Sequence, residues 1–339
     1  MAAPEASASA GARGEAGGKL ILGGEHAVVY GVPAVVVAIP RGLRATAAPG
    51  EVARVDLLGT RRCRRGDPGE LGEAFGALLD AGRPVSVGDV VVRGSLPPGL
   101  GLGFSAAAAV AIARAVEALA ARSSSPPPRE DDEGATVATR VRARADAWER
   151  AFHGNPSGVD VAAAMSGGCL RFDRRTGATE PVLLRDPLVL AVGLTGTGGA
   201  TKTLVAGVAA RRREEPVVFD QTLRAIAEVV ETSIGAMATG NYRALGASLD
   251  RNHELLASWG VSTPALDDLC VSARRAGAWG AKLTGAGGGG AAVAVAADAG
   301  VADEVVAAWR ARGYDGFVTI VPSSDTETTT TRGKERTEP

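Results

Sequence analysis

In the sequence PPGLGLGFSAAAAVAIARA, residues 97–115, a glycine-rich segment is followed directly by an alanine-rich segment that is typical of a helix. Gly99, Gly101 and Gly103 precede Ser105, at which we expect the helix to begin. The unpaired N–H groups and the dipole of a helix N-terminus favour a bound anion. Ser105 could equally act only as the helix cap. By itself the stretch therefore leaves two alternatives, a phosphate-binding turn and an ordinary capped helix.

Two other glycine-rich segments compete for a phosphate-binding role. GTGGATKT (196–203) is close to the Walker A pattern, but Thr201 stands where the pattern needs the glycine that lets the backbone wrap phosphates. KLTGAGGGGAAVAV (282–295) indicates either a flexible turn before a strand or a close approach of the backbone to another group. The first stretch is not a dinucleotide-binding fingerprint, because Phe104 stands where the last glycine of G-x-G-x-x-G is required.

Composition excludes several classes of protein. With 37 basic and 38 acidic residues the net charge is −1, which argues against a nucleic-acid surface but allows a local cationic site for a small anionic substrate. Cys63, Cys169 and Cys270 are far apart and form no CxxC pair, so neither a disulfide framework nor a zinc site is indicated and a cytoplasmic location is favoured. The N-terminus lacks a secretory signal, and the longest apolar run, 27–39, is too short to span a membrane.

The order of strand and helix patterns predicts an α+β protein, because both halves mix the two without strict βαβ alternation. Helices are expected over 105–121, 136–152, 203–213, 217–239, 241–258 and 264–276. We expect a disordered lead over 1–17, an N-terminal domain over 18–180 with a solvent loop at 122–135, a C-terminal domain over 181–322 and a disordered tail over 323–339.

Three segments occur together in order: GGEHAVVYG (23–31), PPGLGLGFSAA (97–107) and KLTGAGGGG (282–290). This set resembles the GHMP family of small-molecule kinases. Three more segments are similar to the members of that family that phosphorylate mevalonate, and the resemblance covers roughly residues 17–322. These segments are HGNPSGVD (153–160), TKTLVAGV (201–208) and LASWGVSTPALDDLC (256–270).

The resemblance implies a fold and a reaction. The N-terminal half would resemble the second domain of ribosomal protein S5, and the C-terminal half would be ferredoxin-like. ATP with Mg²⁺ and the small-molecule substrate mevalonate would meet between them, and the γ-phosphoryl group would pass to the 5-hydroxyl of mevalonate. Two alternatives stay open: another kinase of the family, acting on phosphomevalonate or homoserine, and a non-catalytic ATP-binding homologue. The sequence leaves the oligomeric state open, a homodimer included.

The family pattern also assigns the residues of phosphoryl transfer. Asp160 matches the catalytic aspartate that faces the substrate hydroxyl, as a base or as an orienting group. Lys19 matches the lysine that pairs with it, and a nearby cation keeps a carboxylate ionised. Glu149 and Ser105 are the expected Mg²⁺ ligands, with Asp146 as a rival one turn earlier. For Lys19 and Glu149 the alternative is an ordinary solvated side chain.

The substrate and nucleotide residues follow from the same resemblance. Glu25 and His26 match residues on the mevalonate side, although His26 could also be structural, and Thr203 is a weaker candidate. Val161 replaces a usual asparagine, and Phe104 replaces the first of two serines. The ATP phosphates are expected against Pro98, Gly99, Gly101, Gly103, Phe104, Ser105 and Ala106, and against Gly285, Gly287 and Gly288, which approach the phosphates or brace the first glycine turn.

Overall fold

The computed structural model describes residues 11–123, 136–154, 156–199 and 201–324. Contacts divide the chain into two compact units. The first takes in 41–96 and 105–156 with the segment before Gly18, and the second takes in 18–40, 97–104 and 157 onward. Strands β1 (Ala12–Gly23) and β2 (Ala34–Ala47) pair with each other, and each passes from one unit into the other. The domain boundary expected near residue 180 stays a prediction.

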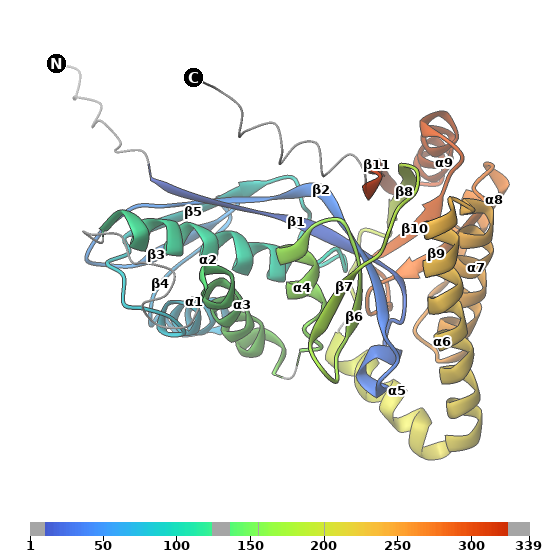
Figure 1. Ribbon diagram of the computed structural model, residues 1–339, viewed down its shortest axis with the longest axis horizontal. Coiled ribbons are helices and arrows are strands. Elements are labelled where there is room, and N and C mark those ends of the chain that lie inside the picture. The colour runs from blue at the N-terminus through green and yellow to red at the C-terminus, as the bar shows by residue number, and fades with distance from the viewer. Residues whose placement is uncertain (1–10, 124–135, 155, 200, 325–339) are drawn as a thin grey trace, which may run out of the picture. The chain divides into compact units, whose positions relative to one another are not determined.

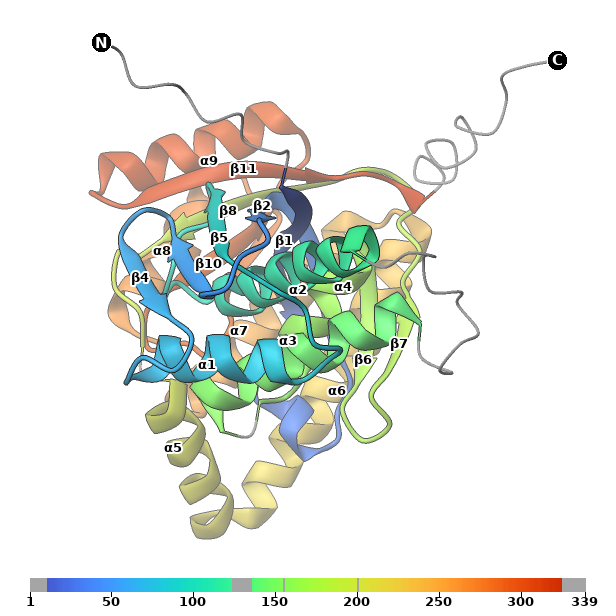
Figure 2. The same cartoon turned by 90° about the vertical axis from the view of Figure 1, so that its left-hand side faces the viewer.

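The first unit combines a small sheet with three helices. Its elements are β3 (Arg54–Leu57), β4 (Arg61–Arg64), β5 (Asp89–Gly94), α1 (Glu70–Asp80), α2 (Phe104–Ser123, from Ser105 on) and α3 (Val137–His153). Strand β4 pairs antiparallel with β3, β3 pairs parallel with β5, and β5 pairs antiparallel with the second half of β2. Val90 and Val92 are buried two residues apart on β5, so they share one apolar face. Helices α1 and α3 pack side by side (Figure 2).

Helix α2 is the buried centre of the first unit. Residues 106–113 are at most 1% exposed, and their small side chains let other elements come close. A Cβ on Gly14 of β1 would stand 2.2 Å from the carbonyl oxygen of Ala111, so only glycine fits this approach. Among the described residues one helix, α2, is long and apolar enough to cross a membrane, but 67% of its most apolar stretch is buried inside the protein. Its hydropathy therefore fits a core helix.

Arg144 joins the three helices of the first unit. Its fully buried guanidinium donates from Nε to Glu117 of α2 at 2.7 Å and from Nη1 to the carbonyl oxygens of Leu78 and Leu79 at 3.0 and 2.8 Å. Those carbonyls belong to the last turn of α1, where helices leave backbone acceptors unpaired. Arg140 donates to the other oxygen of Glu117 at 2.8 Å. A buried charge network therefore sets how α3 lies against α1 and α2.

The second unit contains the other half of β2 with two further strands. These are β6 (Cys169–Asp173) and β7 (Ala178–Pro181), accompanied by the short helices η1 (Ala27–Tyr30) and α4 (Val159–Ser166). Residues 34–37 of β2 pair antiparallel with β6, and β6 pairs antiparallel with β7. Val36, Val159 and Phe172 belong to one buried cluster, which fixes α4 against the strands.

A second sheet lies in the same unit, and its four strands are all antiparallel in the order β11-β8-β10-β9. Helices α7 and α8 pack on β9, and α9 packs on β8 and β11 (Figure 1). The bounds are β8 (Leu188–Leu194), β9 (Gly280–Thr284), β10 (Ala291–Val295), β11 (Asp315–Val321), α5 (Thr201–Glu214), α6 (Pro216–Thr239), α7 (Tyr242–Ser258), α8 (Pro264–Arg275) and α9 (Ala299–Ala311).

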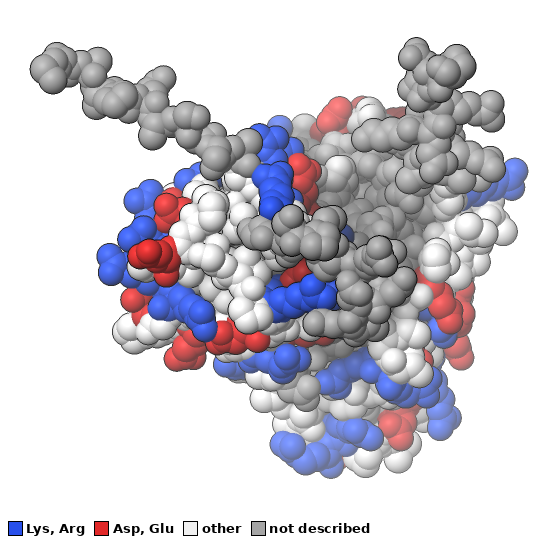
Figure 3. Space-filling view, turned by 60° about the vertical axis from the view of Figure 1, so that its left-hand side comes forward, with Lys and Arg blue, Asp and Glu red and all other residues white. Residues whose placement is uncertain are grey.

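The expected α+β class is confirmed, and each expected helix is present within three residues of its predicted ends. The lead expected up to residue 17 is wrong from Ala12 onward. There the small residues Ala12, Gly14 and Ala16 are buried and alternate with the exposed Arg13 and Glu15, as in a strand with one buried face, and they form the first half of β1. Most of the solvent loop (124–135) and of the tail (325–339) lies outside the described residues. On the face shown in Figure 3, basic and acidic side chains are interspersed, in keeping with the small net charge.

Candidate active site

Three glycine-rich segments of the second unit lie against one another. They are the first segment (97–103), the second (196–199) and the third (285–290), together called the glycine cluster. A Cβ on Gly198 would stand 2.0 Å from the carbonyl oxygen of Gly99. No side chain fits there, so the segment that resembles a Walker A loop packs with its backbone directly on the first glycine segment.

The third segment braces the other two. A Cβ on Gly199 would stand 2.4 Å from the carbonyl oxygen of Gly287, and a Cβ on Gly285 would stand 3.1 Å from that of Gly101. Backbone therefore packs on backbone in the cluster. Of the two roles expected for the third segment, the structure shows the bracing contacts, and an approach to phosphate stays a prediction.

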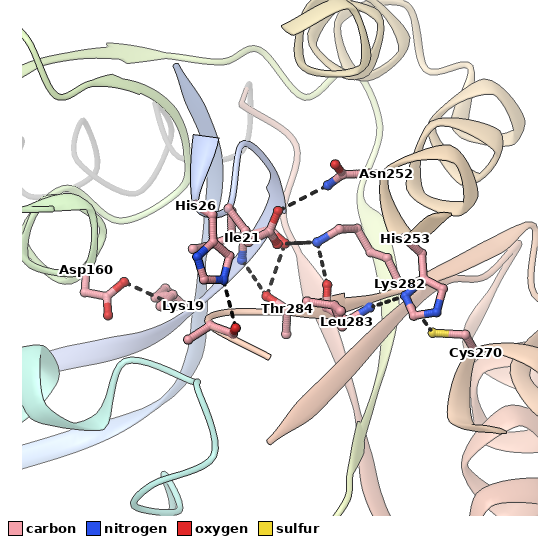
Figure 4. A network of polar contacts seen from close by, with 12 residues as sticks. Lys19, Ile21, His26, Asp160, Asn252, His253, Cys270, Lys282, Leu283 and Thr284 are labelled. Carbon is pink, nitrogen blue, oxygen red and sulfur yellow. Dashed lines mark hydrogen bonds and ion pairs between the residues drawn. The ribbon is translucent and has the colours of Figure 1, made fainter. Parts of the chain in front are cut away.

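Lys19 and Asp160 form an ion pair in the second unit (Figure 4). The Lys19 Nζ lies 3.1 Å from Oδ1 of Asp160, and the lysine side chain is 4% exposed whereas that of the aspartate is 37% exposed. Asp160 is the second residue of α4, which follows Gly158 in the left-handed conformation. The helix N-terminus and the ammonium group both favour negative charge on the carboxylate. The aspartate is thus held by one oxygen and still reachable from solvent.

Lys19 also contacts the first glycine segment. Its backbone N–H donates to the carbonyl oxygen of Leu102 at 3.0 Å. A Cβ on Gly103 would stand 2.9 Å from Cγ of Lys19, so the segment lies directly on the lysine stem. Lys19 is therefore the common neighbour of Asp160 and of the first glycine segment.

The other residues expected at the nucleotide and substrate sites differ in accessibility. Pro98 and Gly99 are exposed, and Phe104 is half-buried. Ala106 is 1% exposed in the first turn of α2, which leaves only its backbone for contact with a ligand. Thr203 is exposed on the first turn of α5. The roles of these residues in binding stay predictions.

His26 has a left-handed backbone conformation, and its hydrogen bond to a backbone carbonyl determines its tautomer. Its φ is 57°, a conformation that costs a non-glycine residue about 1–3 kcal/mol and persists only where its surroundings enforce it. The ring Nε2 lies 2.8 Å from the carbonyl oxygen of Ala286 in the third glycine segment. Since a carbonyl only accepts, Nε2 carries the proton and Nδ1 is an acceptor. Burial lowers the pKa of His26, partly offset by the Ala286 carbonyl and by Glu25, so the ring is neutral at pH 7.

Glu25, beside His26, is held in a buried ion pair. It is 2% exposed, and its Oε1 accepts a hydrogen bond from the fully buried ammonium of Lys282 on β9. Its Oε2 accepts from the amide of Asn252 on α7 at 3.1 Å. Burial lowers the pKa of Lys282, and the charge of Glu25 opposes that shift. Glu25 therefore connects the segment before η1 to β9 and α7, and its direct contact with substrate stays a prediction.

Lys282 further anchors strand β1. Its Nζ donates to the carbonyl oxygens of Ile21 at 3.2 Å and of Leu283 at 2.5 Å. The next residue but one on β9, Thr284, accepts from the N–H of Ile21 at 2.8 Å. β1 and β9 are thus joined through side chains (Figure 4), and the same strands carry Lys19 and lead into the third glycine segment.

His253 on α7 holds the middle of β9. Its Nδ1 accepts from the N–H of Leu283 at 3.2 Å, and its Nε2 lies 3.0 Å from Oδ1 of Asp267. The amide bond requires an unprotonated Nδ1, so the ring is the neutral tautomer with its proton directed at Asp267. Burial, partly offset by Asp267, lowers the pKa of His253. Protonation of Nδ1 would break the contact to β9.

Ser105 and Glu149 meet in the first unit. The Ser105 hydroxyl donates to Oε1 of Glu149 at 2.5 Å, and Glu149 is 3% exposed. The rival Asp146 instead accepts from Arg142 one turn away at 2.8 Å. A hydroxyl and a carboxylate are oxygen ligands of the kind Mg²⁺ prefers, and Mg²⁺ uses few protein ligands. The pair therefore fits a magnesium subsite, and no cluster of three or more His, Cys, Asp or Glu able to hold a metal occurs among the described residues.

Several residues of these networks were not expected from the sequence. The sequence pattern around Lys282 could have indicated its role, because a lysine inside a strand that is otherwise apolar implies a buried partner. No sequence pattern indicated the roles of Asn252 and Trp148, because their partners are distant in the chain. The indole of Trp148 lies beside Ser105.

The glycine cluster, the Lys19–Asp160 pair and the α+β architecture define a small-molecule kinase of the GHMP type. Residues 71–168 match the family description GHMP kinases N terminal domain, and residues 233–315 match GHMP kinases C terminal. The chain belongs to the GHMP kinase family.

Within that family the chain is similar to mevalonate kinases. It is 33% identical to the mevalonate kinase of Methanothermobacter thermautotrophicus over 299 residues, which cover 86% of this chain and 93% of the relative. It is 32% identical to that of Thermococcus sibiricus over 304 residues, covering 82% and 87%. The crystal structure of L. major mevalonate kinase in complex with R-mevalonate superposes with a TM-score of 0.79 at 30% identity, covering 96% of this chain and 99% of that one.

The Lys282–Glu25 pair gives a prediction on stability. Lys282→Met should lower the free energy of unfolding by about 3–5 kcal/mol, because it leaves the Glu25 carboxylate buried without its cation. Adding Glu25→Gln should recover part of that loss. Chemical denaturation measures both, with Arg251→Met as the control, since Arg251 forms an exposed pair with Glu254 and should matter little. A loss no larger than that of the control would contradict the assignment.

The two buried histidines predict that stability falls in acid. Because their pKa values lie below the ordinary 6.5, the unfolded chain binds protons that the folded protein does not. Their contribution is complete above that pH and is lost as the pH falls toward the folded values. His253→Asn retains an acceptor for the Leu283 N–H and should flatten the pH dependence seen by urea denaturation. Equal slopes in the unmutated protein and in His253→Asn would refute the prediction.

Proposed function

We propose that this protein transfers the γ-phosphoryl group of ATP to the 5-hydroxyl of mevalonate, giving 5-phosphomevalonate and ADP. The observation that carries the proposal is the Lys19–Asp160 ion pair, whose lysine side chain lies against the first glycine segment. Relatives with 32–33% identity over most of the chain, which are mevalonate kinases, support the choice of substrate.

Asp160 and Lys19 divide the chemistry of the transfer. Phosphoryl transfer requires aligned reactants, neutralised charge and a group that receives or orients the hydroxyl proton. Asp160 is held through Oδ1 by Lys19, which leaves Oδ2 to meet the 5-hydroxyl. The Lys19 ammonium, already in place before reaction, stabilises the negative charge that develops on the transferred group.

His26 contributes to substrate binding as a neutral ring. Its Nε2 proton is directed to Ala286, so its Nδ1 accepts a hydrogen bond from a hydroxyl of mevalonate. Glu25 acts mainly by holding this segment in place, because both of its oxygens already accept hydrogen bonds within the protein.

ATP is the proposed phosphoryl donor, and Mg²⁺ is its proposed cofactor. Backbone N–H groups of the first glycine segment and of the α2 N-terminus suit the phosphates. Ser105 and Glu149 would hold Mg²⁺, which neutralises phosphate charge when bound. Cys63, Cys169 and Cys270 are all free thiols, which supports the proposed cytoplasmic location.

A substrate panel tests the proposal. ADP release, followed by a coupled assay, should show the highest kcat/KM with mevalonate among mevalonate, phosphomevalonate, homoserine and galactose. Greater activity on another alcohol would replace the substrate assignment. Nucleotide binding without any turnover would favour a non-catalytic homologue.

Asp160→Asn should retain ATP binding and lose about 10²–10⁴-fold in kcat, since an amide neither accepts the proton nor carries the charge. The matched control is Asp146→Asn, which alters a carboxylate paired with Arg142 on α3 and should keep normal turnover. Steady-state kinetics and nucleotide titration distinguish the two variants. Normal turnover by Asp160→Asn would exclude the proposed role.

A further inference from the structure

Trp148 makes a specific contact with the proposed magnesium subsite. It is 1% exposed on α3 and precedes Glu149 in the chain. Its indole Nε1–H donates to Oγ of Ser105 at 3.1 Å, and the same Oγ donates its own proton to Glu149. One serine oxygen therefore has two protein partners, and they come from adjacent residues of one helix.

We propose that Trp148 is a positioning residue for the metal–nucleotide subsite: its indole N–H orients the Ser105 hydroxyl and leaves one lone pair available to a metal ion. The proposal rests on the proposed function, because Ser105 and Glu149 are metal ligands only in that function.

The directions of the two hydrogen bonds follow from the chemistry of the groups. An indole N–H can only donate, and an ionised carboxylate can only accept. A serine hydroxyl has one proton and two lone pairs. With the proton directed to Glu149 and one lone pair occupied by Trp148, a single lone pair remains. Removal of the indole N–H would leave two lone pairs and a hydroxyl with more freedom to turn.

The surrounding packing keeps the indole in place. The Phe152 ring lies 5.4 Å from that of Trp148 between centroids, and the Arg144–Glu117 and Arg140–Glu117 pairs hold α3 on α2. A buried indole N–H needs a partner. Phenylalanine could fill much of the same space without one, so the tryptophan adds the donor to the packing.

A double-mutant cycle separates positioning from packing. The probe is Mn²⁺, whose affinity for the full-length protein with ADP is measured by electron paramagnetic resonance of the free ion. Ser105→Ala and Glu149→Gln should each weaken binding. Trp148→Phe should weaken it about 2- to 10-fold, as expected for the loss of one hydrogen bond. In the Ser105→Ala background Trp148→Phe should have no further effect, because coupled residues are not additive.

The control is Trp309→Phe. Trp309 is also fully buried, but its Nε1 donates to the backbone carbonyl of Leu269 in the second unit. It should lose stability as Trp148→Phe does and keep the Mn²⁺ affinity. If Trp148→Phe weakens binding equally with and without Ser105, it acts through packing and the proposal is wrong. If Ser105→Ala and Glu149→Gln leave Mn²⁺ affinity and mevalonate turnover unchanged, the metal subsite and this proposal both fail.

A measurement that leaves Trp148 in place tests the proposal if Trp148→Phe does not fold. With ¹⁵N-labelled tryptophan, the indole resonance that shifts in Ser105→Ala identifies Trp148. That resonance should also move when Mg²⁺ with ADP is added, because the hydrogen bond to Oγ changes as Oγ binds the metal. The Trp309 resonance should stay in place. No movement of the Trp148 resonance at saturating Mg²⁺–ADP would overturn the proposal.

Discussion

The ion pair between Lys282 and Glu25 is the interaction on which the second unit depends most. Two opposite charges lie within the core, where either alone would be costly. The lysine belongs to β9 and also binds the backbone of β1, while the glutamate precedes His26. The pair therefore fixes together the strand that carries Lys19, the strand that leads into the third glycine segment, and the residue proposed to meet substrate.

Several groups around this pair are kept in one protonation or hydrogen-bonding state. The backbone amide of Leu283 selects the neutral tautomer of His253, and the Ala286 carbonyl selects that of His26. In both cases a backbone group, which cannot titrate, determines which ring nitrogen carries the proton. The backbone of β9 and of the third glycine segment thus fixes the protonation of these two histidines, in addition to the contacts between side chains.

Much of the fold was predictable because helices such as α3, α7 and α8 have clear apolar periodicity and clear ends. Thr136, Thr263 and Asp298 cap their helices through side chains. The segment Ala12–Gly17 was misjudged because small residues without bulky apolar side chains give little sign of a strand. Lys19 and Asp160 were predicted as a pair from the family pattern, and the structure brings them together. The partners of Glu25, and the contact between Trp148 and Ser105, depend on residues that only the fold makes neighbours.

The interlocked glycine segments have a consequence for how the protein folds. The segments come from residues near 100, 198 and 287, so their contacts close two long loops of the chain. Contacts between residues close in sequence do not help to form the cluster. Long-range contacts slow folding, because the entropy of closing the loop is lost before the contacts stabilise the chain. A glycine cluster also loses more backbone entropy on ordering than other residues would. A nucleotide that binds only the assembled cluster would raise the free energy of unfolding by mass action and so offset that entropy loss. The nucleotide used in the reaction would then also stabilise the folded chain.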